Sequence, residues 1–378
     1  MNIIYPKNKL LKYLSYTDTI SSSKTTIPVL SNVLITAEEN MISLNASNLE
    51  TGIRIVDTAE VKEKGALAVN GKKLTSIIRE LPDSDVSLST DEHNRMTIQS
   101  TSPDIKARFV VAGLQREDFP DIKTEPEGEY IQLKAEEFKN MIKKVIFSIS
   151  TDENKYSLTG VFFEKDDNGI NMVATDGKRL SLISKTIEEL EIAREAIHIP
   201  HDGIIIPKIV LSEIIRYSFE SNKIDMGFSK NQIFFSYDNI HLTSNLIEGK
   251  FPEYKKIIPD ERGTFFLSEK TLLFSAIRRV SVLVDESYNQ IKLSILKNKL
   301  LISSKNPSMG GAVEEIPVEY DGEDIDIAVN YLYLIDCLKE ISSDTVKIDF
   351  ENAERVVTIR GRDEANYVNL IMPMKINL

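Results

Sequence analysis

The sequence predicts an α+β protein made of three tandem copies of one domain, each with two helices packed on antiparallel sheets. The chain of 378 residues is too long for one ordinary core. An amphipathic segment followed by a pair of strands occurs three times along it. The copies are regularly spaced, because Ile42, Ile170 and Leu300 on the return strands lie 128 and 130 residues apart.

Each strand pair is recognised by alternating apolar residues on its return strand. The second pair turns at Asp166–Gly169, where the Asn-Gly step favours a tight hairpin, and the third turns at Lys297 and Asn298. The expected pairs span residues 29–46, 158–174 and 291–304.

Six amphipathic segments predict six helices, two in each copy. In the third segment, Phe138, Met141 and Ile142 begin an apolar stripe with the spacing of a helix face. Pro82 ends the second segment, and Ser268 is expected to cap the N-terminus of the fifth. The expected helices span residues 7–16, 70–81, 133–150, 207–219, 268–284 and 329–342.

The copy boundaries are marked by a repeated motif. The segment DFPDI at 118–122 is echoed by KFPEY at 250–254, with Phe119 and Phe251 separated by 132 residues. The segment YVNLIMPMKI at 367–376 closes the third copy in the same way. We therefore expect domains at residues 1–126, 127–252 and 253–378.

Charge is divided unevenly between the helices and the rest of the chain. The formal net charge is −12, yet the six helical windows together carry +9, which leaves −21 for the remainder. If the helices face one way, they form a positive surface suited to a polyanion beside an acidic exterior. Most of the helical cations are lysines, which suit phosphate better than base edges, so no base-sequence reading is expected.

No constellation of residues predicts catalysis, a metal site or a cofactor. His198 and His201 lack acidic or cysteine ligands beside them, and Asp166 and Asp167 lie in a turn. The segment GALAVNGKK at 65–73 has the wrong glycine spacing for a phosphate-binding loop. We expect a protein that is not an enzyme.

Two further features bear on the cellular compartment. The start of the chain lacks the apolar run of a secretory signal, and no stretch of 18 uncharged apolar residues occurs. Cys337 is the single cysteine and cannot form an internal disulfide, which agrees with a reducing compartment. A cytoplasmic location is expected.

Several segments carry a family resemblance. They are ATDGKRLSLIS at 174–184, GKFPEY at 249–254 and IMPMKI at 371–376, supported by IPVLSNVLI at 27–35 and SNLETGI at 47–53. The chain thereby resembles the bacterial replicative DNA sliding clamp, the beta subunit of DNA polymerase III. The resemblance implies three DNA-clamp domains that assemble into a head-to-tail homodimeric ring around duplex DNA. It implies a processivity factor that tethers the replicative DNA polymerase, the clamp loader and repair enzymes through short linear peptides.

The resemblance also implies a peptide-binding cleft between the second and third domains. Its apolar Leu, Ile, Met and Pro residues suit an adaptable pocket. Lys178 stands where the family often has His, and Lys256 and Lys375 stand where it has Arg. The matching positions are Leu158, Thr175, Gly177, Lys178, Arg179, Leu180, Pro252, Lys256, Ile257, Leu370, Ile371, Met372, Pro373, Met374 and Lys375.

By the same resemblance, an edge strand of the first domain would join the third domain of a second subunit. In that interface Phe109 and Val111 would pack against Val282 and Leu283, and two cations would face two carboxylates. Those charged residues are Lys106 and Arg108 on one side and Glu314 and Glu315 on the other. The residues expected near DNA are Lys24, Lys72, Lys73, Lys155 and Tyr156.

Two alternatives stay open at this stage. One is a clamp paralogue that binds partners without serving replication. The other is a three-domain enzyme whose active site is not recognisable in the sequence. A ligand-dependent activity lost on changing one carboxylate would favour the enzyme.

Overall fold

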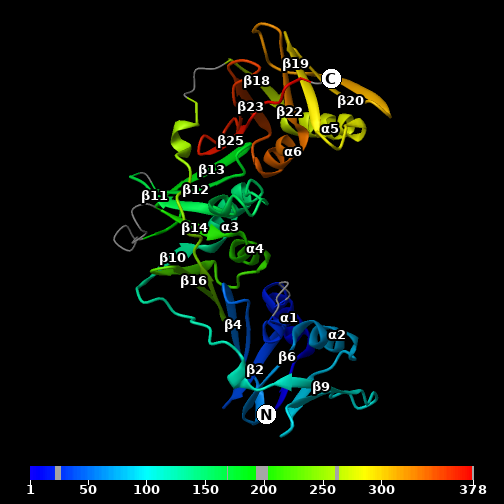
Figure 1. Ribbon diagram of the computed structural model, residues 1–378, viewed down its shortest axis with the longest axis vertical. Helices are drawn as coiled ribbons and strands as arrows, with labels where there is room; N and C mark the ends of the chain where they lie inside the picture. The colour runs from blue at the N-terminus through cyan, green and yellow to red at the C-terminus, as the bar shows by residue number, and fades with distance from the viewer. Residues whose placement is uncertain (22–26, 168, 193–202, 260–263, 377–378) are drawn as a thin grey trace. The chain divides into compact units, whose positions relative to one another are not determined.

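The helices of the protein occur where the apolar spacing predicts them. The computed structural model describes residues 1–21, 27–167, 169–192, 203–259 and 264–376. Within them, all six expected helices form, with α1 and α2 side by side and α5 beside α6 (Figure 1). Their bounds are α1 Lys7–Ser21, α2 Gly71–Glu80, α3 Ala135–Ile146, α4 Lys208–Arg216, α5 Lys270–Val280 and α6 Tyr331–Glu340.

One predicted helix cap is wrong. Ser268 belongs to strand β18 and pairs with Val346, so α5 starts two residues later. Glu269 occupies the capping position, and no side chain caps the helix there. The strand runs directly into the helix, which leaves no connecting turn in which Ser268 could cap.

The chain folds into two compact units. The first comprises Met1–Glu136, Glu191–Ile197 and Ser212–Leu246. It contains one 13-stranded sheet, whose strands in spatial order are β10 (Tyr130–Lys134), β15 (Lys223–Ser229), β16 (Gln232–Tyr237), β17 (Ile240–Asn245), β4 (Thr51–Thr58), β3 (Met41–Ser47), β2 (Asn32–Glu38), β6 (Gly65–Asn70), β9 (Arg108–Leu114), β8 (Arg95–Ser100), β7 (Val86–Thr90), β1 (Asn2–Tyr5) and β5 (Glu60–Glu63).

The second unit comprises Glu137–Leu190, His198–Leu211 and Ile247–Leu378 and contains two sheets. The eight-stranded sheet has the order β14 (Ile204–Pro207), β11 (Gly160–Lys165), β12 (Gly169–Thr175), β13 (Arg179–Thr186), β25 (Tyr367–Ile371), β24 (Val357–Gly361), β23 (Thr345–Phe350) and β18 (Thr264–Glu269). The four-stranded sheet has the order β21 (Gly310–Pro317), β20 (Lys299–Asn306), β19 (Gln290–Leu296) and β22 (Ile325–Asn330).

The middle copy shares one sheet with each neighbouring copy. Strand β17 pairs antiparallel with β4 of the first copy, from Ile240 opposite Ile55 to Ser244 opposite Thr51. Strand β13 pairs antiparallel with β25 of the third copy, in a register that places Leu180 opposite Leu370. Backbone hydrogen bonds therefore join consecutive copies. The boundaries at 126/127 and 252/253 stay predictions.

The three predicted strand pairs are β2–β3, β11–β12 and β19–β20. Two of them start later than expected, because Val29 and Leu158 lie in short 3-10 helices, Pro28–Ser31 and Tyr156–Leu158. Asn298 adopts the left-handed φ of +57° that the two-residue turn between β19 and β20 requires. Asn168 of the second turn lies outside the described residues.

A buried ion pair connects the middle and third copies inside the second unit. The Lys144 Nζ atom lies 2.8 Å from the Glu364 Oε1 atom and donates to the Glu340 carbonyl at 2.8 Å. The Tyr367 hydroxyl donates to the Lys144 carbonyl at 2.8 Å, and the ammonium lies over its ring. Lys144 is 4% exposed, so this cation of α3 does not contribute to a positive surface.

None of the helices in the part of the chain that the structure describes is long and apolar enough to cross a membrane.

Removal of the Lys144 ammonium tests the contribution of the Lys144–Glu364 ion pair to stability. Burial raises the pKa of Glu364, but hydrogen bonds from Lys144, Ser342 and Ser343 outweigh it and hold the pKa below its usual value. Lys144→Met leaves a buried carboxylate without its cation, so we expect the free energy of unfolding at neutral pH to fall by about 3 kcal/mol. Denaturant unfolding measures this, with exposed Lys143→Met as the control.

The pH dependence follows from the sign of that shift. The ionised Glu364 stabilises the folded state above the carboxyl pKa of the unfolded chain, and this contribution is lost as the pH falls through the lower folded pKa. The difference between the wild type and Lys144→Met should therefore shrink on acidification. A difference that stays constant down to about pH 3 would contradict the assignment.

Candidate functional site

The turn between β12 and β13 is built by its own polar side chains. The Asp176 carboxylate accepts the backbone amides of Lys178 at 2.8 Å and Arg179 at 3.0 Å. The Gly177 amide donates to the Thr175 hydroxyl at 3.0 Å. Gly177 has a φ of +89°, which a side chain would strain. The turn is thus fixed in a form that exposes Lys178.

The last described residues continue from β25 along the same turn. The Met372 amide donates to the Lys178 carbonyl at 2.9 Å, and the Met374 amide donates to the Ala328 carbonyl at 2.7 Å. Met372 itself is 46% exposed. These bonds hold an apolar segment against the Lys178 turn and strand β22.

The segment between the second and third copies packs against β11. The ring of Phe251 stacks on that of Phe162, with centroids 4.8 Å apart and planes within 7°. Tyr254 begins a short 3-10 helix, Tyr254–Lys256, and is buried. Ile257, which follows it, is 48% exposed.

These three segments meet over one buried apolar cluster, which we call the peptide-site cluster. Leu158 is partly buried and packs against it. The predicted residues Leu180 and Leu370 are members, but the sequence analysis missed the other seven, three of them aromatic. The apolar run of β11 and the Phe-Pro repeat were the available signals. The cluster consists of Phe162, Val173, Leu180, Ile205, Ile247, Phe251, Tyr254, Val368 and Leu370.

The fifteen residues predicted for the peptide cleft all belong to the second unit, but they divide by exposure. The buried ones form the underlying structure and are Thr175, Leu180, Leu370 and Ile371. The partly buried ones are Leu158, Arg179, Pro373 and Met374. The exposed ones, which a peptide could contact directly, are Gly177, Lys178, Pro252, Lys256, Ile257, Met372 and Lys375.

Arg179 is occupied by structural contacts. Its guanidinium contacts Asp176 at 3.1 Å and Asp336 of α6 at 2.8 Å, and it donates to the Phe147 carbonyl. It also lies 4.4 Å from the ring centroid of Tyr333. The side chain is 12% exposed, so Arg179 joins β13 to α6 within the site.

The exposed lysines of the site differ from Arg179. Among the described residues, neither Lys178 nor Lys375 has a carboxylate within ion-pair distance, whereas Lys256 pairs with Glu253. Lys375 lies in the same segment as exposed Met372, whose amide donates to the Lys178 carbonyl. Cations next to an apolar side chain suit a peptide that carries both apolar side chains and a carboxylate.

Four of the residues predicted to contact DNA, Lys72, Lys73, Lys155 and Tyr156, are exposed. Lys72 and Lys73 are exposed in the first turn of α2, where Asn70 accepts the Lys73 amide at 3.0 Å. The N-terminus of a helix carries partial positive charge, which adds to the positive potential around these ammonium groups. Lys155 donates to the Asp176 carbonyl at 3.1 Å, and Tyr156 is 56% exposed. Lys24 lies outside the described residues.

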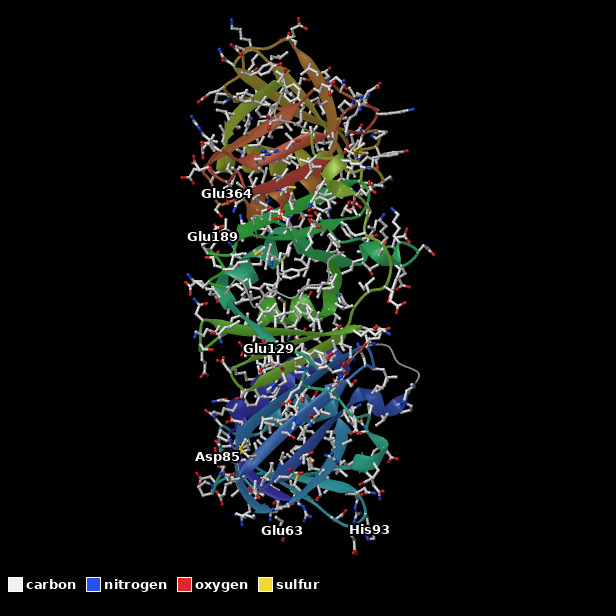
Figure 2. The ribbon with its side chains drawn as sticks, turned by 90° about the vertical axis from the view of Figure 1, so that its left-hand side faces the viewer. Glu63, Asp85, His93, Glu129, Glu189 and Glu364 are labelled. Atoms are coloured by element: carbon white, nitrogen blue, oxygen red, sulfur yellow. The ribbon has the colours of Figure 1, made fainter. Side chains whose placement is uncertain are left out.

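The carboxylates agree with the predicted division of charge. Glu63 lies in β5, while Asp85, Glu129, Glu189 and Glu364 lie in turns or connections (Figure 2). The helix lysines are instead exposed or partly buried, apart from the buried Lys144 described above. Cations outnumber carboxylates in each of the six helices except α6, so positive charge is concentrated on these helices and most negative charge lies on strands and their connections.

Strand β9, which carries the predicted interface residues Phe109 and Val111, has an open edge. On one side it pairs with β8 over Arg108–Ala112, but on the other only Gly113 and Leu114 pair with β6. Phe109 and its neighbour Val110 are 38% and 52% exposed. Lys106 is exposed just before the strand.

Strand β21, on the other side of the predicted interface, lies at the edge of its sheet and pairs only with β20. Val313 on it is 69% exposed, and nearby Val282 is 75% exposed, whereas Leu283 is partly buried. Glu314 already pairs with Arg279 at 3.0 Å and Glu315 with Lys299 at 3.3 Å. The sequence analysis missed Val110 and Val313, whose exposure only the structure reveals.

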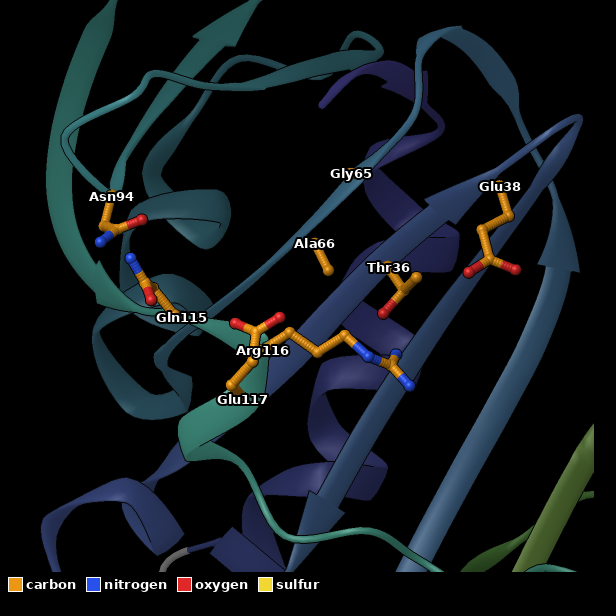
Figure 3. A pocket seen from close by; sticks show the side chains of 8 residues that line it. All are labelled: Thr36, Glu38, Gly65, Ala66, Asn94, Gln115, Arg116 and Glu117. Atoms are coloured by element: carbon orange, nitrogen blue, oxygen red, sulfur yellow. The ribbon is translucent and has the colours of Figure 1, made fainter.

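A polar cavity of about 560 Å³ lies in the first unit, and none of the predicted site residues lines it (Figure 3). Arg116 extends across it, and the buried Thr36 hydroxyl that lines it has no hydrogen-bond partner. Its lining consists of Thr36, Glu38, Gly65, Ala66, Asn94, Gln115, Arg116 and Glu117. No group of metal-ligating side chains gathers in any part of the described chain.

Replacing each of the two neighbouring cations of the turn distinguishes the structural role of Arg179 from the exposed position of Lys178. Arg179→Ala removes a partly buried guanidinium and leaves Asp336 without its closest cation. We therefore expect the free energy of unfolding to fall by roughly 2–3 kcal/mol. Lys178→Ala should leave stability unchanged within about 0.5 kcal/mol. Thermal and denaturant unfolding measure both, and equal effects would contradict the assigned roles.

Comparisons with known proteins agree with this architecture over the whole chain. Residues 1–123, 132–253 and 255–375 match the N-terminal, central and C-terminal domain models of the DNA polymerase III beta subunit. The beta sliding clamp of Treponema pallidum is 29% identical, over 99% of this chain and 100% of its own.

Solved structures give the same result. The Caulobacter crescentus beta sliding clamp superposes with a TM-score of 0.92 at 29% identity, covering 100% of this chain and 99% of its own. The Bartonella birtlesii clamp bound to griselimycin has a TM-score of 0.90 at 28% identity, covering 100% of both chains. The expected three DNA-clamp domains are thereby confirmed, and the chain belongs to the DNA polymerase III beta subunit family.

Proposed function

We propose that this chain is a DNA sliding clamp: a non-catalytic subunit that encircles duplex DNA and tethers the replicative polymerase, the clamp loader and repair enzymes. One observation carries this proposal. The clamp domain occurs three times, and the family models span nearly the whole chain in order. The location is the cytoplasm, and the domains are 1–126, 127–252 and 253–378.

The division of charge supports a sequence-independent grip on DNA. Exposed lysines such as Lys72 and Lys73 provide mobile point charges that neutralise phosphates without reading base edges. Lys24, Lys155 and Tyr156 complete the proposed DNA-contacting set. Weak, salt-sensitive contacts of this kind keep a ring on the duplex while they allow it to move along the helix.

The exposed part of the peptide site supports docking of linear peptides. Ile257, Pro252 and Met372 offer apolar surface above the peptide-site cluster, and Lys178 and Lys375 offer charge. The flexible thioether of Met372 can adapt to several peptides. One site can then serve several enzymes in turn.

The open edges of β9 and β21 support a head-to-tail homodimer. Each edge carries exposed valine and unpaired backbone groups, which a second copy can cover by adding a strand. Lys106 and Arg108 would then face Glu314 and Glu315. Because Glu314 and Glu315 already have partners, these cations would enter an existing charge network.

Retention on DNA tests the proposed function directly. After loading by the clamp loader of the same organism, the protein should remain on closed circular DNA at high salt and be lost from linear DNA through its ends. Gel filtration of labelled protein with each DNA measures the retention. Equal loss from circles and linear DNA would contradict encirclement, because a topological link does not depend on salt-sensitive phosphate contacts.

A charge placed on the β9 edge tests the ring. Phe109→Asp puts a carboxylate into the proposed apolar contact, so light scattering should give the monomer mass of 42.7 kDa instead of twice that mass. Met41→Asp, which changes a similarly exposed residue of the first unit, is the control and should stay dimeric. A dimeric Phe109→Asp protein at micromolar concentration would refute the interface.

A further inference from the structure

The segment at 249–258, between the second and third copies, is attached to strand β11 through one carboxylate. The Tyr254 hydroxyl donates to the Glu164 Oε1 atom at 2.5 Å, and the Lys255 ammonium lies 2.8 Å from the same atom. Asn171 of β12 donates to it at 3.2 Å. We call Glu164, Asn171, Tyr254 and Lys255 the linker tether.

Glu164 is itself held firmly. Asn171 also donates to Asp166 at 2.7 Å and accepts from Ser184 at 2.6 Å, so the amide is oriented by the β11–β12 hairpin and by β13. The Glu164 side chain is 16% exposed. A carboxylate this sheltered, with donors on both sides, is a fixed point to which a connecting segment can be anchored.

The attachment of the segment depends on this carboxylate. Within the described chain, the side-chain hydrogen bonds and ion pairs that join 249–258 to the rest of the second unit go to Glu164, with Asn171 as a second hydrogen-bond partner of the Tyr254 hydroxyl. The other two ion pairs of the segment, from Lys250 and Lys256, both go to Glu253 and remain inside it. Its remaining attachment is apolar, through Phe251 and Tyr254 in the peptide-site cluster and Ile258 packed against that cluster.

The tether fixes the part of the segment that a peptide would meet. The amide of Tyr254 donates to the Pro252 carbonyl at 2.7 Å, and that of Ile257 donates to the Tyr254 carbonyl at 2.9 Å. The positions of exposed Pro252 and Ile257 therefore follow from that of Tyr254. The neighbouring Lys256 amide donates to the Glu253 carbonyl at 3.2 Å.

We propose that Glu164 is a positioning residue for peptide binding: through Tyr254 and Lys255 it holds one wall of the peptide site in its binding form. This inference rests on the proposed function, since it assumes that a peptide docks beside Pro252 and Ile257. Glu164 does not touch the peptide. Its contribution is to reduce the conformational freedom that the segment loses on binding.

Three variants and one matched control test the proposal in the full-length protein. Tyr254→Phe removes the hydroxyl but keeps the ring in its cluster, Glu164→Ala removes the anchor, and Glu164→Gln keeps an acceptor for Tyr254 while it loses the charge facing Lys255. The control is Tyr5→Phe, which removes an equivalent hydroxyl, 2.5 Å from Asp57 in the first unit.

The probe is a fluorescent pentapeptide with leucine and phenylalanine side chains and one aspartate, which match the apolar and cationic parts of the site. We expect Tyr254→Phe and Glu164→Ala to weaken its binding about fivefold, mainly through faster dissociation. Glu164→Gln should fall between them and the wild type. The control Tyr5→Phe should bind like the wild type.

Two further readouts separate positioning from general destabilisation. Hydrogen exchange at the amides of Tyr254, Lys256 and Ile257 should speed up in the variants, while that of the β13–β25 pair stays slow. Because Glu164 acts through Tyr254, the double variant Tyr254→Phe/Glu164→Ala should bind little worse than Glu164→Ala alone.

Faster exchange with unchanged peptide affinity would overturn the proposal, and so would fully additive losses. Weakening in Tyr5→Phe equal to that in Tyr254→Phe would also overturn it, because the effect would then be general. Absence of peptide binding by the wild-type protein, with retention on circular DNA intact, would instead contradict the peptide part of the proposed function.

Discussion

Antiparallel pairing between strands of different copies is the constraint on which the rest of this structure depends. A sheet edge presents backbone donors and acceptors that must be covered or left to water. Strand β17 covers the edge of β4, and β25 covers the edge of β13. Three copies that could have been linked by flexible segments alone are thereby joined through continuous hydrogen-bonded ladders.

The candidate peptide site is a consequence of one of these ladders. In the β13–β25 register, Leu180 and Leu370 are directly opposite each other, and both enter the peptide-site cluster. The ladder also brings the exposed Met372 to the Lys178 turn. A shift of one residue in the pairing would turn these side chains to the other face of the sheet, so the register and the site are set together.

Buried polar groups add specificity at the same joint. The Lys144–Glu364 pair and the Arg179 contacts connect α3 and β13 to the third copy, and each is satisfied by further hydrogen bonds. Charges sheltered in this way contribute little net stability over an apolar contact, but an incorrect partner leaves them unpaired. They favour one relative arrangement of the second and third copies within the unit. Burial of the apolar cluster provides most of the stabilisation of this contact.

Much of the organisation could be predicted from the sequence because it depends on local patterns. Apolar spacing gave the six helices, and alternation with turn residues gave the three strand pairs, since both reflect which side of one element faces the core. Excess lysine in the helical windows likewise indicated where positive charge lies. The motif segments of the family predicted a peptide site and its residues, and that assignment stays a prediction.

What the tertiary structure decided concerns contacts between residues far apart in the chain. Ser268 proved to be part of a strand because its partner Val346 lies in a distant segment, and Lys144 proved to be buried because Glu364 and Tyr367 surround it. The spacing of apolar residues along the chain does not identify such distant partners. The same reason separates Arg179 from Lys178: adjacent cations look equivalent in sequence, but only the folded chain places Asp336 beside one of them.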